Sequence, residues 1–273
     1  MTIHQFKISL EETALLLHLK NEELQAKELL QIAFEEVTPS ELEKIFITAS
    51  HSLISKELVT VNETSLQIIE SLDLLLNNML NPDFSLHYQK LDIKEETMYT
   101  GHIHKVNNTL VSYQSQDGIT HMIKEVMIDE VLYKESALLL DLQIHDGNKS
   151  PDILACLPAE VVENISDFIQ QPIQKSTEKL IQYGFSSENL TLFLNDLQHI
   201  KYVYSIMKIE TTSSQILKAD QGIMILESNE HQWLLYQSDD NKSFFVSYLS
   251  KKLFERQLRS LLHISDSIEV PHE

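Results

Sequence analysis

The sequence is poor in the residues that build common chemical sites. Its 273 residues include a single cysteine, Cys156, so no disulfide can form within the chain, which suits a reducing compartment. The five glycines stand singly, and no phosphate or dinucleotide loop can be assembled from them. No apolar run reaches the ~18 residues of a membrane-spanning helix. The pattern therefore favours a soluble protein without a nucleotide site.

Basic residues are also scarce. Lysine and arginine number 21 against 41 aspartates and glutamates, which leaves a net charge of −20. Such a surface repels phosphate backbones, so we expect no nucleic-acid partner. The segment Met1–Lys7 leads into an acidic helix rather than a signal sequence, and we therefore expect a cytoplasmic protein. The acid excess favours solubility and the attraction of basic proteins.

Capping residues and apolar periodicity predict helices at the start of the chain. Ser9 and Glu12 form a capping box that opens a helical stretch to about Gln31. Thr38-Pro39 starts a second helix, in which apolar residues recur every three or four positions. That apolar face consists of Leu42, Ile45, Phe46, Ala49 and Leu53. A third helix is predicted over about 63–80.

The period then changes to that of strands. Short segments rich in β-branched and aromatic residues are separated by turn residues, which predicts antiparallel neighbours. The predicted strands are Phe84–Leu91, Met98–Val106, Thr109–Ser115 and Ile119–Lys124. A helix over about Asp129–Leu142 follows, and the polar segment 146–152 is predicted to be a linker.

The same order of elements recurs after the linker. Helices are predicted at about 158–170, 172–183, 187–199 and 250–262, and strands at Lys201–Ile209, Gly222–Glu227, His231–Gln237 and Ser243–Leu249. We therefore predict a first α+β half at 1–145, the linker at 146–152 and a second α+β half at 153–273. The two halves are expected to pack as one pseudo-symmetric domain.

A local likeness accompanies this repeat. Tyr113–Asp117 (YQSQD) resembles Tyr236–Asp240 (YQSDD), and both segments lie at the predicted turn between the last two strands of their half. Duplication explains the shared order, and two sheets with exposed edges would gain by pairing. The predicted fold is thus a pseudo-twofold, duplicated helices–sheet–helix unit, in which a central antiparallel sheet is flanked by helical bundles.

The sequence contains no motif that names a reaction. His102 and His104 share one face of a predicted strand, and with His121 on a nearby strand they could hold zinc. No carboxylate or cysteine stands at ligand spacing, and solvent-facing or packing histidines are the alternative. No nucleophile elbow or other catalytic motif is present. We therefore predict no enzymatic activity, no cofactor and no resident metal.

Aromatic and leucine side chains in the second half supply the candidate partner-binding residues. Strand aromatics could form an apolar patch, and the helix at 187–199 could line a groove for a partner helix. Packing inside the protein's own core is the alternative for both groups. The candidate residues are Tyr183, Phe185, Leu190, Phe193, Leu197, Trp233, Phe244 and Tyr248.

Three segments of the first half resemble the EspG-type chaperones of type VII (ESX) secretion. They are Ser9–Leu19 (SLEETALLLHL), Ser50–Val59 (SHSLISKELV) and Leu72–Tyr88 (LDLLLNNMLNPDFSLHY). The resemblance covers roughly 80 residues in detail and the rest by the order of elements. It implies a quasi-twofold α+β fold and a cytosolic chaperone that caps the apolar tip of an exported helical hairpin.

The leading functional hypothesis is therefore a non-enzymatic chaperone or adaptor that binds a helical secreted protein. The alternative is an immunity or antitoxin protein that captures a basic toxin, which the net charge of −20 would favour. A DNA-binding regulator built around Thr38–Val59 and a metalloenzyme using the three histidines are two further hypotheses, and the acidic charge opposes the first of these.

Overall fold

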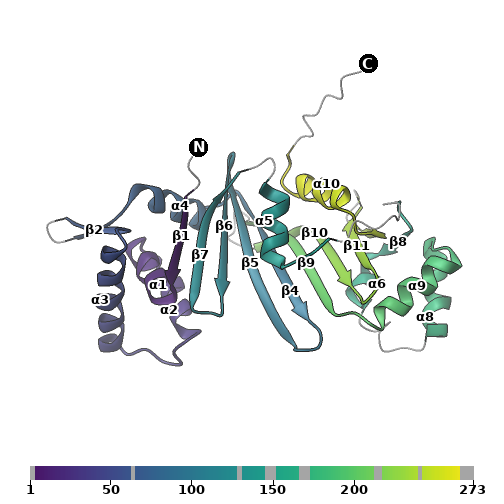
Figure 1. The fold of residues 1–273 in the computed structure, drawn as a ribbon, viewed down its shortest axis with the longest axis horizontal. Helices are drawn as coiled ribbons and strands as arrows, with labels where there is room; N and C mark the ends of the chain where they lie inside the picture. Colours follow the sequence, from purple (N-terminus) through teal and green to yellow (C-terminus); the bar gives the residue numbers. More distant parts are fainter. Residues whose placement is uncertain are drawn as a thin grey trace, which may run out of the picture. The chain divides into compact units, whose positions relative to one another are not determined.

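The computed structural model describes residues 4–62, 65–127, 131–144, 152–165, 173–211, 217–238 and 242–264. Helices accompany a large antiparallel sheet, which confirms the predicted α+β class (Figure 1). The chain divides into two compact units: a first unit of residues 1–85 and 101–129, and a second unit of residues 86–100 and 130–273. Among the described helices, none combines the length and apolarity that crossing a membrane would require.

The first unit contains a strand, a group of helices and a meander of strands. Its opening elements are β1 (Gln5–Ser9), α1 (Leu10–Leu19), α2 (Glu23–Gln31) and α3 (Pro39–Ser55). A two-stranded hairpin, β2 (Val59–Asn62) and β3 (Ser65–Ile68), precedes α4 (Glu70–Leu80). The meander strands are β4 (Phe84–Asp92), β5 (Thr97–Val106), β6 (Thr109–Gln116) and β7 (Thr120–Val126), of which β4 and β5 continue into the second unit.

The predicted helix starts are confirmed in the first unit. The side chain of Ser9 accepts a hydrogen bond from the backbone of Glu12, whose carboxylate accepts one from the backbone of Ser9. Thr38 and Glu41 form the same capping box at α3. The predicted stretch from Ser9 to Gln31 is instead two helices, because Asn21 takes a left-handed backbone angle, φ 65°, that breaks the helix.

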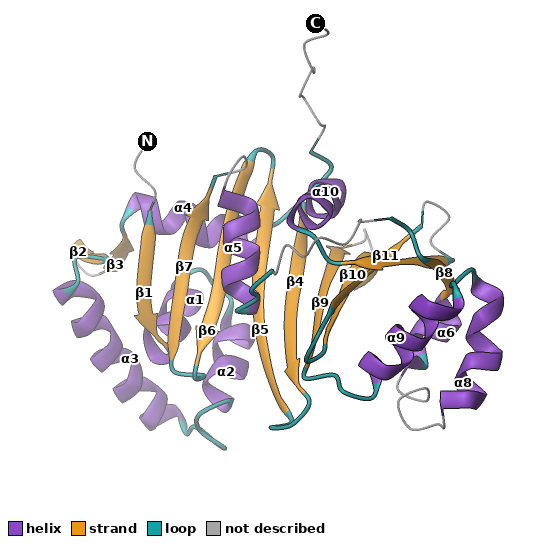
Figure 2. Cartoon of the chain, turned by 45° about the vertical axis from the view of Figure 1, so that its right-hand side comes forward, coloured by secondary structure: helices purple, strands orange, loops and turns teal. Residues whose placement is uncertain are grey.

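The core of the first unit lies between helices and one face of its strands (Figure 2). The strand order is β1-β7-β6-β5, and β1 and β7 pair antiparallel with Ile8 opposite His121. Ile8, Val111 and Ile123 from these strands pack with buried leucines of α1, α3 and α4. The predicted helix at 63–80 is correct only over α4, because Ser65–Ile68 pairs with Val59–Asn62 as a hairpin.

The second unit repeats this order of elements. It contains α5 (Val131–Leu140), β8 (Ala155–Pro158), α6 (Ala159–Glu163), α8 (Ile173–Leu180), a short 3₁₀ helix (Ile181–Tyr183) and α9 (Ser187–Leu197). Its meander consists of β9 (Tyr202–Thr211), β10 (Leu217–Glu227), β11 (Gln232–Gln237) and β12 (Ser243–Tyr248), followed by α10 (Lys251–Leu261). The strand order is β4-β9-β10-β11-β12-β8, and α10 packs against β10 and α5.

The duplication is therefore visible in the pairing of strands as well as in their order. In each unit the strand before the helices pairs antiparallel with the last strand of the meander, β1 with β7 and β8 with β12. Both similar pentapeptides begin in the next-to-last strand of their meander, Tyr113 in β6 and Tyr236 in β11, and Asp239 and Asp240 lie outside the described residues. The predicted domain boundaries remain a prediction, and most of the predicted linker lies outside the described residues.

Candidate partner-binding groove

The eight candidate partner-binding residues come together in the core of the second unit. Phe193 and Trp233 are 0% and 1% exposed, and Phe185, Leu190, Leu197 and Tyr248 are also buried. Tyr183 and Phe244 are partly buried and pack against the same cluster. The side chains therefore offer little surface to a partner as the protein stands, and their role in partner binding remains a prediction.

These aromatic rings form a continuous stack. Phe185 stacks on Phe193 with ring centroids 5.2 Å apart, and Phe193 meets Trp233 edge to face at 5.1 Å. Trp233 in turn stacks on Tyr248 at 4.4 Å. Aromatic pairs in such geometries contribute ~1 kcal/mol beyond the area they bury. The stack fills the space between α9 and the strands of the second unit.

A buried carboxylate that is not among the residues singled out from the sequence holds this core in place. Asp196 of α9 is 4% exposed. It accepts hydrogen bonds from Trp233 Nε1 at 2.9 Å and from Ser228 Oγ at 2.8 Å, and His231 Nδ1 lies 2.8 Å from it. The network joins α9 to the β10–β11 turn, so its clearest role is structural. An aspartate among leucines in a helix is the one sequence signal that could have marked it.

The histidines considered as zinc ligands pack within the sheet of the first unit. The rings of His102 and His104 stack at 5.7 Å, and the hydroxyl of Tyr113 lies 2.6 Å from His121 Nδ1. Burial lowers the pKa of His104 to about 4, and burial also lowers the pKa of His121. Within the described part of the chain, no three His, Cys, Asp or Glu side chains converge as metal ligands would.

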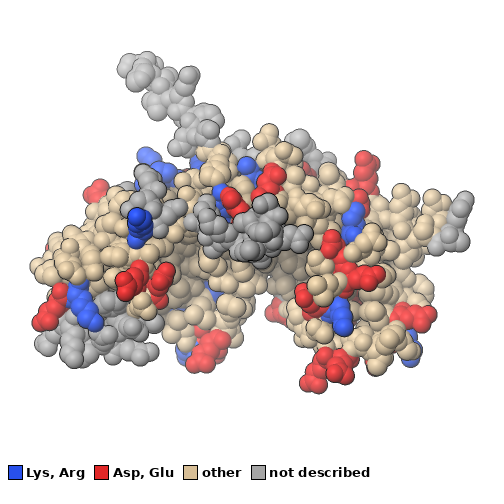
Figure 3. Space-filling model, turned by 180° about the vertical axis from the view of Figure 1, so that it is seen from behind, with Lys and Arg blue, Asp and Glu red and all other residues tan. Residues whose placement is uncertain are grey.

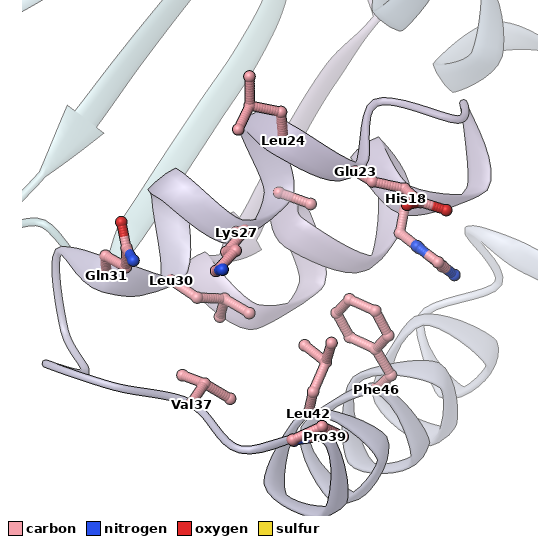
Figure 4. Close-up of a pocket in the computed structure, with 11 residues that line it drawn as sticks. His18, Glu23, Leu24, Lys27, Leu30, Gln31, Val37, Pro39, Leu42 and Phe46 are labelled. Carbon is pink, nitrogen blue, oxygen red and sulfur yellow. The ribbon is translucent and has the colours of Figure 1, made fainter.

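An open apolar pocket of about 600 Å³ lies between α1, α2 and α3. We call it the α1–α3 groove. Figure 4 shows Leu42 and Phe46 of α3 facing Leu30 and Lys27 of α2 across the space. The other lining residues are His18, Glu23, Leu24, Ala26, Gln31, Val37 and Pro39. Its volume falls in the range of ~300–1,000 Å³ that is usual for ligand pockets.

The groove exists because α2 and α3 each pack mainly on α1 and make few contacts with each other. On α2 the groove is lined by Ala26, whose methyl group fills little space, and by Lys27, whose charged end stays in water. Opposite them, Leu42 and Phe46 are only partly buried. The sequence predicted the apolar face of α3 correctly, but it gave no sign that half of that face lacks a cover.

Two ion pairs hold the helices around the groove. Lys56, directly after α3, lies 2.7 Å from the buried carboxylate of Glu12 on α1, and Lys20 lies 2.8 Å from Asp73 on α4. Burial alone would raise the pKa of Glu12, but hydrogen bonds from Lys56 and the backbone of Ser9 lower it below its usual value. The first of these pairs fixes the end of α3 on α1 and so helps to hold one wall of the groove.

Apolar and acidic side chains surround the groove. Leu24, which lines the groove, is 66% exposed, and Ile47 on α3 is 49% exposed. Between Asn21 and Phe46 the chain carries seven glutamates against two lysines, all at least partly exposed. Figure 3 shows acidic side chains spread over the visible face of the protein, with basic side chains among them. An apolar hollow with a polar rim is the usual form of a protein-interaction site.

Comparison with solved structures supports the fold. The structure of the type VII secretion chaperone EspG5 of Mycobacterium tuberculosis, in complex with the PE25–PPE41 dimer, matches with a TM-score of 0.64 and 12% identity over 97% of this chain and 98% of that chain. The protein therefore has an EspG-like fold. The full-length peroxisomal multifunctional enzyme type 2 of Drosophila melanogaster matches with a TM-score of only 0.16 and 9% identity over 90% of this chain and 47% of that chain, and carries no argument.

Sequence comparison gives the family. A search of curated proteins finds no match. A protein-family model, described as "Uncharacterised protein YfjC", matches residues 5–258. That span includes both units from β1 into α10. The chain belongs to the YfjC family.

Proposed function

We propose that the protein is a non-enzymatic chaperone or adaptor that binds another protein and keeps a helical type VII secretion substrate soluble in the cytosol. The observation that carries the proposal is the α1–α3 groove, a preformed apolar hollow with exposed leucine and isoleucine side chains on its helices. Soluble proteins retain such surfaces mainly where they bind a partner. The EspG-like fold supports the same function, since EspG5 is a secretion chaperone solved with a PE25–PPE41 dimer.

Affinity capture from the native host, followed by reconstitution, tests the proposal. We expect the tagged protein to retain a small helical secreted protein, identified by mass spectrometry. That partner, expressed alone, should sediment as aggregate, and co-expression with this protein should keep it in the soluble fraction. A partner that is equally soluble alone, or one that the protein modifies covalently, would overturn the proposal.

A second candidate function follows from the net charge of −20. An immunity or antitoxin protein would capture a basic toxin by long-range attraction, and its association rate would fall steeply with salt. A chaperone complex formed through apolar side chains would keep most of its affinity. Association and dissociation rates of the captured partner, measured between 50 and 500 mM NaCl (about a threefold change in Debye length), therefore separate the two functions.

A further inference from the structure

We infer that the α1–α3 groove receives an amphipathic helix of the partner, with leucine- or phenylalanine-sized side chains on one face and lysine or arginine on its flanks. The inference rests on the proposed function and names the chemistry of the partner at one site. Three features of the groove favour it: its helical walls, its apolar floor and its acidic rim.

The walls select a helix over an extended peptide. An extended peptide gains affinity from a sheet edge, where free backbone N–H and C=O groups add a strand. The groove is lined by α1, α2 and α3, whose interior backbone groups are hydrogen-bonded within each helix. A helix that lies between α2 and α3 would pack side chains against both, as the missing member of a four-helix arrangement.

The floor and walls select apolar anchors. Ala26 and Leu30 of α2 and Leu10 and Ala14 of α1 form a small buried cluster. Leu42 and Phe46 border it and remain partly open to water. Leucine or phenylalanine side chains at successive turns of a helix would enter this hollow and remove the remaining apolar surface from water.

The rim selects the charge of the flanks. Glu23 and Lys27 both line the groove, but the segment from Asn21 to Phe46, which supplies α2 and the start of α3, carries seven glutamates against two lysines, Lys27 and Lys44. A helix with basic flanks is attracted to this rim, whereas an acidic helix is repelled. The same charge disfavours a fatty acid or an anionic lipid, although the volume of about 600 Å³ could accept an acyl chain.

Two synthetic helical peptides test the inference against the full-length protein. Both carry leucine at positions i, i+4, i+7 and i+11, and they differ only in lysine or glutamate on the flanks. Fluorescence anisotropy of the labelled peptides should show the lysine peptide binding at least about tenfold more tightly than the glutamate peptide at low salt. This difference in affinity should shrink at 0.5 M NaCl, because the Debye length is then only about 4 Å and the charges are screened.

Groove variants locate the binding. Leu42→Glu should abolish binding of the lysine peptide, and the matched control Leu138→Glu, at a position 68% exposed on α5, should not change it. Glu23→Lys alters only the rim and should weaken the lysine peptide by about threefold while strengthening the glutamate peptide. Because Glu23 is exposed, this variant tests the inference even if Leu42→Glu misfolds.

Several outcomes would overturn the inference. They are equal binding of both peptides, binding unaffected by Leu42→Glu and Glu23→Lys, displacement of the lysine peptide by oleate, or a homodimer that Leu42→Glu dissociates. Capture of the native partner separates this failure from that of the proposed function. If the Leu42→Glu variant and the wild-type protein retain the same secreted helical protein, the proposed function stands and the assignment of the binding site to the groove fails. If the lysine peptide binds but no partner is kept soluble, the proposed function fails.

Discussion

The helices of the first unit and those of the second unit occupy equivalent places in the duplicated order, yet the spaces that they border are filled to different degrees. In the second unit, Phe193 and Trp233 are 0% and 1% exposed within a continuous aromatic stack. In the first unit, the α1–α3 groove stays open over about 600 Å³. The helices of the second unit thus enclose a closed aromatic core, whereas those of the first unit leave an apolar hollow open to water.

The largest expected loss of stability comes from a cavity made in the closed core of the second unit. Phe193→Ala should lower the free energy of unfolding by about 3–5 kcal/mol, because a fully buried ring is removed and the surrounding helix and strands cannot collapse onto the space. Trp233 is the only tryptophan, so its fluorescence during urea unfolding reports on this core.

The matched variant in the open groove should cost far less. Phe46→Ala should lower the free energy of unfolding by about 1–2 kcal/mol, because its ring is already partly in water. Circular dichroism measures this unfolding. Equal losses for Phe46→Ala and Phe193→Ala would show that the groove is as closed as the second core.

Acid should act on the first unit through His104. Burial lowers its pKa to about 4 from 6.5, so the unfolded chain binds the extra proton first as the pH falls. The stabilisation is fully present above pH 6.5 and is lost on acidification to about pH 4, with a limit on the order of 3 kcal/mol.

Urea unfolding at several pH values, followed by circular dichroism, measures this dependence. His104→Gln should keep a partner for Ser85, which lies 2.8 Å from His104 Nδ1, and should reduce the loss of stability between pH 6.5 and 4, leaving the part that is due to His121. An unchanged profile in the variant would contradict the assignment to His104.

The carboxylate behind the aromatic stack should give an effect of comparable size. Asp196→Ala should cost about 1–3 kcal/mol, because Trp233 Nε1 and Ser228 Oγ lose their buried acceptor. Asp196→Asn keeps one acceptor oxygen and should cost less. The tryptophan fluorescence of both variants in urea gives the comparison, and a loss as small for alanine as for asparagine would argue against this network.

The smallest effect on stability should come from filling the groove. Ala26→Leu makes the first unit resemble the second by placing a larger side chain in the hollow, and it should change the free energy of unfolding by less than about 1 kcal/mol. Binding of the lysine peptide should nevertheless fall several-fold. Unchanged peptide affinity with an unchanged fold would place the binding surface elsewhere.

The sequence predicted the elements whose signals are local. Capping at Ser9 and Thr38, the alternation of the meander strands and the repeated order of elements all have periodic or short-range signatures, and the structure contains them. β1 and β8 were missed, because each is four or five residues long and pairs with a strand far along the chain. Gln5–Ser9 does alternate polar and apolar side chains, but a run of only five residues that leads directly into a helix cap is short evidence for a strand.

The candidate site was harder to predict for a related reason. The apolar stripe from Leu42 to Leu53 on α3 looks uniform in the sequence, yet Ala49 and Leu53 are buried whereas Leu42 and Phe46 line the groove. Periodicity identifies an apolar face but not whether another element covers it. The aromatic residues of the second half were predicted to bind a partner because they are large and apolar, and the same property places them in a core.

The short strands β1 and β8 have a consequence for aggregation of the protein. Within the described residues each pairs with one neighbour only, β7 or β12, and so leaves a row of backbone groups where a foreign strand could add. β1 exposes the charge of Lys7, and β8 ends at Pro158, which has no N–H to donate. These sheet edges therefore give a misfolded chain little template for adding strands and growing a fibre.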